Sequence, residues 1–128
     1  MIPVIDFTSE SVLDEIREAY TTVGFAVFTN TLTAKDQTIM NNWFEDMKEF
    51  FRLDIDTKKQ YSYQAENNLG YSIMGAENVD PTAPKDMKES FNYNNTRMPD
   101  SLWPVEVDGF RENGLETIRI ADDLTLRI

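Results

Sequence analysis

The residue types available for chemistry in this chain are restricted by two absences. The 128 residues include no histidine and no cysteine. Histidine is the commonest metal ligand and the usual general base near neutral pH, and cysteine supplies thiolate ligands and nucleophiles. The sequence therefore excludes, within this chain, a serine triad, histidine-based zinc or haem sites, disulfides and iron–sulfur clusters. Any chemistry would depend on Asp, Glu, Lys, Tyr, Ser or Thr.

Adjacent charged residues are the first candidates for such chemistry. Lys88-Glu89 could form a catalytic pair, but a charged pair beside a short strand is usually solvated or structural. Glu45-Asp46 and Asp122-Asp123 are expected on exposed helix faces. A glycoside hydrolase that uses only carboxylates needs two acids across a cleft, and nothing in the sequence singles out such a pair. An enzyme of that kind is the least favoured alternative.

Composition and charge limit the possible partners. The net charge is −11, with 12 basic and 23 acidic residues, and no face-length cluster of Lys and Arg occurs. Nucleic-acid binding and binding to an anionic membrane surface both need the opposite charge. The hydrophobic fraction of 41% suits a folded core, and no apolar run is long enough to span a bilayer. Without a secretory signal at the N-terminus, we expect an acidic, cytoplasmic protein with no nucleic-acid or membrane partner.

The first half of the chain predicts two strands and two main helices. The strands cover Val4–Phe7 and Phe25–Thr29, the second being apolar, β-branched and expected to be well buried. An amphipathic helix is expected near residues 11–23, and Gly24 ends it. Thr33 and Asp36 resemble a capping box before a long helix. Its apolar face comprises Ile39, Met40, Trp43, Phe44, Met47, Phe50 and Phe51.

The second half predicts shorter elements joined by loops. A short helix is expected to start near Asp56 or Thr57, followed by a strand-like piece within Gly70–Gly75 and a half-buried strand over Ser90–Asn94. Residues 78–84 and 95–109 are expected to be loops. A last helical stripe comprises Phe110, Leu115, Ile118, Ala121, Leu124 and Ile128. The pattern predicts a mixed α/β (α+β) fold that is rich in helix.

These segments, taken in order, resemble the isopenicillin N synthase-like 2-oxoglutarate/Fe(II) dioxygenases, specifically their N-terminal domain. Ile2–Phe7 resembles the opening strand of that family and Gly24–Asn30 its second strand. Further resemblances are Phe50-Phe51, Lys58-Lys59 with Tyr61, Gly70-Tyr71 with Gly75 and Glu77, Asp86–Phe91, and Trp103-Pro104 before Gly109–Arg111. One departure occurs where the family usually has Asn-His-Gly, because Asn30 is followed here by Thr31 and Leu32.

The resemblance implies cofactors that this chain is not expected to bind. In the family, two histidines and one carboxylate of a double-stranded β-helix (jelly roll) hold Fe(II), and an arginine there binds 2-oxoglutarate. Those motifs belong to the C-terminal half, so we assign no catalytic, cofactor-binding or metal-binding residue to positions 1–128. Iron(II) in such enzymes needs a three-ligand face with open positions, and carboxylates alone hold it weakly.

The resemblance also implies three candidate residues at the substrate entrance. In the family, the segment after the long helix approaches the mouth of the active site and can touch substrate. Tyr71 and Ser72 are the corresponding candidates here, and Arg97 in the following loop could meet an anionic substrate. The alternative interpretation is that Tyr71 packs at the edge of the sheet and Ser72 faces water.

Two hypotheses of different classes follow. In the first, residues 1–128 are the non-catalytic N-terminal domain of an oxidoreductase that acts on a small molecule, and the chain is truncated within its last helix, about 110–128. The missing catalytic half or self-association would then cover its strands. In the second, the chain is a stand-alone binding or interaction module derived from the same fold. The presence or absence of downstream coding sequence discriminates between them.

Overall fold

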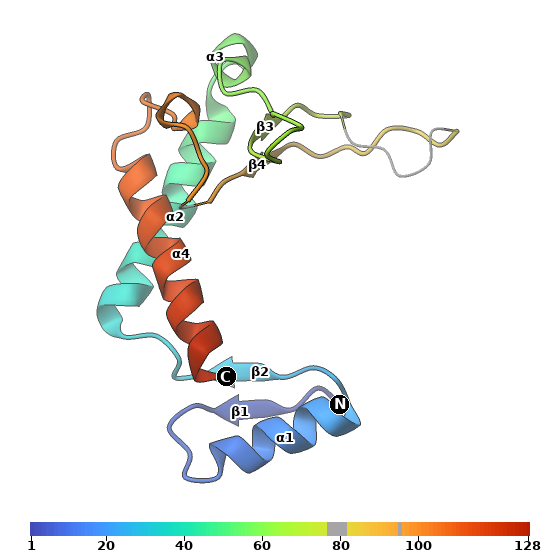
Figure 1. Ribbon diagram of the computed structural model, residues 1–128, viewed down its shortest axis with the longest axis vertical. Helices are drawn as coiled ribbons and strands as arrows, with labels where there is room; N and C mark the ends of the chain where they lie inside the picture. Colours follow the sequence, from blue (N-terminus) through green and yellow to red (C-terminus); the bar gives the residue numbers. More distant parts are fainter. Residues whose placement is uncertain (77–81, 95) are drawn as a thin grey trace. The chain divides into compact units, whose positions relative to one another are not determined.

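The computed structural model describes residues 1–76, 82–94 and 96–128 in two compact units (Figure 1). The first unit comprises residues 1–38 and 120–128, and the second comprises residues 39–119. Glu77, which belongs to one family motif, and Asn95 lie outside the described residues. The elements are mixed helix and strand, as the sequence predicts, and no helix of the described residues is long and apolar enough to cross a membrane.

The first unit contains a parallel pair of strands joined through a helix. Strand β1 (Val4–Asp6) pairs with β2 (Val27–Thr29), and α1 (Val12–Thr22) connects them. Ile5, Ile16 and Ala19 form its buried core, with Phe7, Val12, Ala26 and Phe28 packed around them. Both strands are shorter than predicted, and Phe25 and Phe7 lie outside them.

The face of this sheet opposite α1 is apolar and exposed. Side chains alternate between the two faces of a strand, so Ile5 and Phe28 point toward α1 while their neighbours Val4 and Val27 point away from it. Val4 and Val27 are register partners and are 65% and 50% exposed. Phe25 is also exposed. The prediction that the second strand is well buried is therefore wrong, because helix α1 covers only one face.

Helix α2 (Ala34–Arg52) begins with the capping box that the sequence predicts. The Thr33 hydroxyl donates to Asp36 Oδ2 at 2.7 Å and accepts from the Asp36 N–H at 3.1 Å. The Thr33 N–H also donates to Asp36 Oδ2 at 3.2 Å. These reciprocal bonds satisfy backbone donors that the first turn of a helix leaves free, which fixes where α2 starts.

The core of the second unit is almost entirely aromatic. Its buried members are Trp43, Phe50, Tyr61, Tyr71, Phe91, Trp103, Val107 and Phe110. Phe50 is fully buried, and its ring centroid lies 5.1 Å from that of Phe91 and 5.5 Å from that of Phe110. Of the predicted apolar face of the long helix, Trp43, Met47, Phe50 and Phe51 pack into this core. Ile39 and Met40 are only half-buried and lie outside the core cluster, and Phe44 is 62% exposed beneath the Lys48 ammonium.

Two short antiparallel strands pack on this aromatic core. Strand β3 (Gly70–Ser72) pairs with β4 (Ser90–Asn92), so that Tyr71 faces Phe91. Helix α3 (Ile55–Lys59) precedes them and is capped by the Asp54 carboxylate. Gly70 has φ +100°, and a Cβ there would lie 2.7 Å from the carbonyl oxygen of Tyr61. Only glycine fits this close approach without displacing the backbone.

Helix α4 (Phe110–Arg127) follows a short 3-10 helix, η1 (Asp100–Leu102). Within the second unit, Gly114 lets the indoles of Trp43 and Trp103 approach the helix, because a Cβ would lie 3.0–3.2 Å from them. The predicted apolar stripe is wrong at two positions. Ala121 and Ile128 are exposed, whereas Ile120, outside the predicted stripe, is 4% exposed.

Candidate functional site

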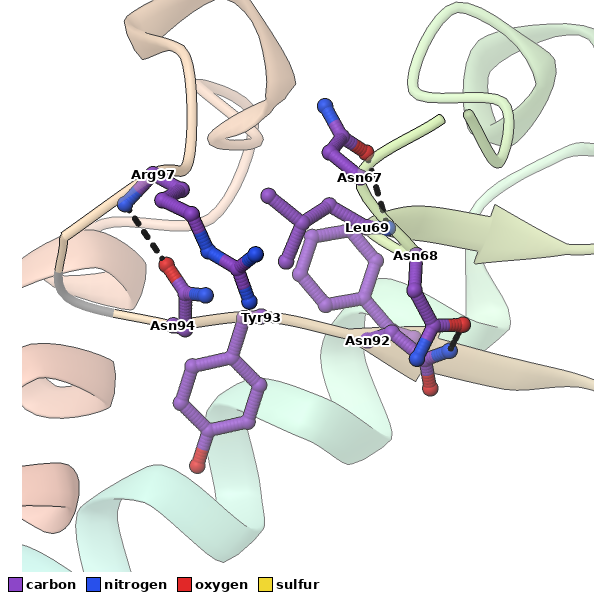
Figure 2. A pocket seen from close by; sticks show the side chains of 8 residues that line it. Asn67, Asn68, Leu69, Asn92, Tyr93, Asn94 and Arg97 are labelled. Atoms are coloured by element: carbon purple, nitrogen blue, oxygen red, sulfur yellow. Dashed lines mark hydrogen bonds between the residues drawn. The ribbon is translucent and has the colours of Figure 1, made fainter. Parts of the chain in front are cut away.

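Arg97 lies in a polar cleft beside the β3–β4 pair, in the second unit. The cleft has a volume of about 360 Å³ and is lined by Asn67, Asn68, Leu69, Phe91, Asn92, Tyr93, Asn94 and Arg97. Figure 2 shows the Arg97 side chain reaching from its loop toward the centre of this set, while the Tyr93 ring points away from it. The lining contains four amide side chains and one cation, and it contains no carboxylate.

The loop that carries Arg97 is held by the side chain of Asn94. The Asn94 Oδ1 atom accepts hydrogen bonds from the backbone N–H of Thr96 at 3.2 Å and of Arg97 at 2.8 Å. This is the local turn that asparagine favours. The donors are the backbone N–H groups of Thr96 and of Arg97 itself, so the turn holds the backbone from which the Arg97 side chain extends into the cleft (Figure 2).

The opposite wall is built by the chain between α3 and β3. The Leu69 N–H donates to Asn67 Oδ1 at 3.0 Å, and Asn67 Nδ2 donates to Gln64 at 2.7 Å. Asn68 has φ +61°, a left-handed conformation that asparagine tolerates. Its Oδ1 accepts from the Tyr63 hydroxyl at 2.9 Å and from Asn92 Nδ2 at 3.4 Å. These bonds tie the wall to strand β4.

Ser72 lies in a neighbouring cleft. That cleft, of about 410 Å³, is lined by Tyr63, Asn68, Ser72, Ala76, Lys88, Ser90 and Asn92. Ser72 is 8% exposed, so it does not face open water. The two clefts share Asn68 and Asn92. The structure thus brings Ser72 and Arg97 to two clefts that share Asn68 and Asn92, without placing them in one cavity.

Tyr71 lines neither of these clefts. It is 2% exposed, its ring packs against Phe50, and its hydroxyl donates to Glu89 Oε2 at 2.5 Å. Burial, together with the hydrogen bond to Glu89 and the charge of that carboxylate, raises the pKa of Tyr71 far above its ordinary value. Its hydroxyl group is engaged inside the unit.

Glu89 forms its ion pair with Lys58 rather than with its sequence neighbour Lys88. The Lys58 Nζ atom lies 2.8 Å from Glu89 Oε2 and donates to the carbonyl of Phe51 at 3.0 Å. Burial raises the pKa of Glu89, but the hydrogen bonds from Lys58 and Tyr71 and the charge of Lys58 outweigh it, so the pKa is lowered. Lys58 is 6% exposed. The cluster therefore links α2, α3, β3 and the residue before β4.

Sequence reasoning missed the asparagines that line the clefts. The available signal was their density, since Asn67, Asn68, Asn92 and Asn94 all fall in two short polar stretches. Amide side chains are common in ordinary turns, so composition alone does not distinguish a lining residue from a loop residue. The pairing of β3 with β4 is what gathers them.

The residues of this chain do not fit a mononuclear iron centre. The sequence has no histidine, and among the described residues no three Asp or Glu side chains are grouped so that they could hold a metal ion. Iron(II) in the two-histidine, one-carboxylate facial triad depends on imidazole ligands for affinity and selectivity. No iron-dependent step is therefore assigned to the residues that the structure describes.

Comparisons with known proteins agree with the mixed fold and identify the domain. A full-length Neurospora crassa protein, crystallised in complex with alpha-KG, superimposes with a TM-score of 0.77 at 24% sequence identity. The match covers 98% of this chain and 44% of that one, so this chain spans less than half of its length. At this identity the likeness shows the fold. No curated protein matches the chain.

A family model gives the clearest assignment. The model described as "non-haem dioxygenase in morphine synthesis N-terminal" matches residues 2–108. This range includes both strand pairs, helices α1 to α3 and every residue that lines the two clefts. With most of its length matched, the chain belongs to the family of non-haem dioxygenase N-terminal domains.

Proposed function

We propose that this chain is the non-catalytic N-terminal region of an iron(II)- and 2-oxoglutarate-dependent oxidoreductase. Its role is to support a catalytic jelly-roll barrel supplied by other residues and to wall the entrance for a small-molecule substrate. The observation that carries the proposal is the exposed apolar face of the β1–β2 sheet, in a chain that belongs to this family.

Parallel strands normally have both faces covered. Here α1 covers the face with Ile5 and Phe28, while the opposite face presents Val4 and Val27 to solvent. Ile2 and Phe25 lie two residues before these valines, outside the two strands, and are also more than half exposed. A contiguous apolar patch of this kind marks an interface with another layer. The barrel of a longer dioxygenase is the layer we propose.

The chemistry of the residues agrees with a supporting role. The chain has no histidine to bind iron(II), so the metal and 2-oxoglutarate would be held by residues outside positions 1–128. Bound iron would supply oxygen activation, which is the cofactor's chemistry. The residues of this chain would instead shape the entrance, with Ser72 and Arg97 on adjoining clefts. A cytoplasmic location is part of the same proposal.

The test compares the exposed patch with an exposed residue elsewhere. A hydrophobic dye should bind the 128-residue chain, and the double variant Val4→Thr/Val27→Thr should bind much less dye while keeping its helical circular dichroism. Leu13→Thr is the matched control, since Leu13 is 68% exposed but lies on α1. Equal dye binding by the wild type and both variants would contradict a role for this sheet face.

A second measurement addresses catalysis directly. Anaerobic calorimetry with iron(II) should show no micromolar one-to-one site on the chain alone, and the chain should not turn over 2-oxoglutarate. A tight site on residues 1–128 would overturn the proposal that the metal is held elsewhere.

A further inference from the structure

We infer that the Arg97 cleft binds a carboxylate group of a small ligand, held by the Arg97 guanidinium and the amide N–H groups of Asn94 and Asn68. The inference deepens the proposed function and rests on it in one respect, which is that the ligand is the substrate of the full-length enzyme.

The amide of Asn94 is oriented by the backbone. Two backbone N–H groups, those of Thr96 and Arg97, donate to its Oδ1 atom, and a backbone N–H can only donate. The oxygen must therefore face the loop, and the Nδ2 group occupies the other position of the amide. The two N–H donors on Nδ2 have no partner among the residues that the structure describes. Figure 2 places this side chain beside the Arg97 guanidinium.

On the opposite wall, the amide of Asn68 is bonded to side chains rather than to the backbone. Its Oδ1 atom accepts from the Tyr63 hydroxyl and from Asn92 Nδ2, which leaves its own Nδ2 group with two N–H donors. In the described part of the chain these donors also lack a partner. With Asn94, they give the cleft a surplus of hydrogen-bond donors. A ligand that satisfies them must present acceptor oxygens.

The charge of the cleft favours an anionic acceptor. Arg97 is the one cation among the lining residues, and none of those residues is acidic. Acidic residues outnumber basic ones by 23 to 12 in the chain, so a lining free of carboxylates is not what the composition would produce on average. The Arg97 side chain forms no ion pair with any residue in the described ranges. Guanidinium binds carboxylates through two parallel, charge-assisted hydrogen bonds.

The size and floor of the cleft limit the rest of the ligand. Leu69 and Phe91 are 3% and 7% exposed and supply an apolar floor. The volume of about 360 Å³ is at the lower end of the range for small-molecule sites. These features suit a compact molecule with a short hydrocarbon part and one carboxylate. A large lipophilic ligand would leave the Nδ2 groups of Asn68 and Asn94 without acceptors.

The test is an NMR titration of the 128-residue chain with propionate and with its neutral isostere, propionamide. Propionate should shift the side-chain signals of Asn68, Asn94 and Arg97 in a saturable way, and propionamide should bind at least tenfold more weakly. Inorganic phosphate serves as a second anion and should also bind more weakly, because it lacks the planar shape. The absence of saturable propionate shifts, or equal shifts with propionamide or phosphate, would overturn the inference.

Two variants isolate the groups involved. Arg97→Gln removes the cation, and Asn94→Asp keeps the oxygen that holds the loop while replacing the donor by a negative charge. Each should weaken propionate binding at least tenfold with little change in the backbone spectrum. Arg111→Gln is the control, because Arg111 pairs with Asp100 outside this cleft. Unchanged binding in Arg97→Gln would refute the assignment.

The outcomes separate this inference from the proposed function. The titration needs neither iron nor a barrel. Propionate binding, together with dye binding that is unchanged in Val4→Thr/Val27→Thr, would support the carboxylate site and count against the supporting role of the sheet. Dye binding that depends on Val4 and Val27, without any propionate binding, would support the role of the sheet face and refute the carboxylate site.

Discussion

Replacing Lys58 by Met should be among the most damaging single changes in the second unit. The Lys58–Glu89 pair has a Nζ–Oε2 distance of 2.8 Å, and the two side chains are only 8% and 22% exposed. Lys58→Met leaves the Glu89 carboxylate partly buried with Tyr71 as its remaining donor, and it frees the Phe51 carbonyl. Removing one member of a buried pair typically costs about 3–5 kcal/mol. Because Glu89 keeps some contact with water, we expect Lys58→Met to lower the free energy of unfolding by about 3 kcal/mol, the lower end of this range.

The chain offers a closely matched control. The Lys48–Glu45 pair has the same 2.8 Å distance, but its side chains are 42% and 67% exposed. Both lysines also lie over an aromatic ring, at 4.5 Å for Lys48 and Phe44 and at 5.3 Å for Lys58 and Tyr71. An exposed pair contributes about 0–1 kcal/mol, so Lys48→Met should cost less than about 1 kcal/mol. Burial is the main difference between the two substitutions.

The assay is urea unfolding followed by tryptophan fluorescence. Both tryptophans, Trp43 and Trp103, lie in the aromatic core of the unit that contains Lys58, so the signal reports on that unit. The midpoint and slope give the free energy of unfolding for each variant. Equal losses for Lys58→Met and Lys48→Met would refute the view that burial makes the Lys58 pair important.

The pH dependence supplies an independent check. The pKa of Glu89 is lowered from its ordinary 4.5 in the folded state. The stabilisation from its pairing is therefore fully present above that ordinary value and is lost as the pH falls through the lowered one. The stability difference between wild type and Lys58→Met should be constant between about pH 5 and 8 and should shrink below about pH 4. A difference that stays constant into acid would contradict this account.

Two further predictions concern backbone geometry and can be measured in the same unfolding assay. Gly70→Ala should lower the free energy of unfolding by about 3 kcal/mol or more, because the new Cβ would lie 2.7 Å from the Tyr61 carbonyl oxygen. Gly24→Ala should lower it by only about 1 kcal/mol, because Gly24 has φ +79° but open space around it. Similar losses at both glycines would show that the close contact is unimportant. Thr33→Ala should lower the free energy of unfolding by about 1 kcal/mol through loss of the capping box of α2. Thr38→Ala, which removes an exposed hydroxyl bonded to the Ala34 carbonyl, should change it by less than about 0.5 kcal/mol. Helix content by circular dichroism should change in the same order, and an unaffected Thr33→Ala would argue against the cap.

Local patterns predicted the elements of this fold well because each has a short-range cause. The capping box of Thr33 and Asp36 fixes the start of α2, and the spacing of Trp43, Phe50 and their neighbours fixes the face that it buries. Phe44 fits the same spacing and is exposed, because hydrophobic periodicity does not state how wide the buried stripe is. Exposure of Val27 likewise depends on what covers the sheet, which no local pattern encodes.

The candidate site was less predictable because it depends on contacts distant in sequence. The sequence singles out Arg97, and Asn94 lies close to it in the chain, but Asn67 and Asn68 come from the turn before β3, more than 20 residues away from Asn92 on β4. A family motif singles out Tyr71, but its environment depends on Lys58 in α3 and on Glu89, the residue before β4. The partners of a polar side chain follow from tertiary packing, whereas its residue type alone suggests only what it could bind.

The reading frame beyond codon 128 tests the central proposal most directly. If residues 1–128 are the N-terminal region of an iron(II)/2-oxoglutarate oxidoreductase, nucleotide sequencing should find coding sequence that first completes the helix containing Phe110–Arg127. It should then encode strands with a His-x-Asp or His-x-Glu pair, a later single histidine and an arginine close behind it. A stop codon directly after Ile128, with no nearby gene encoding such a barrel, would contradict the proposal and favour a stand-alone interaction module.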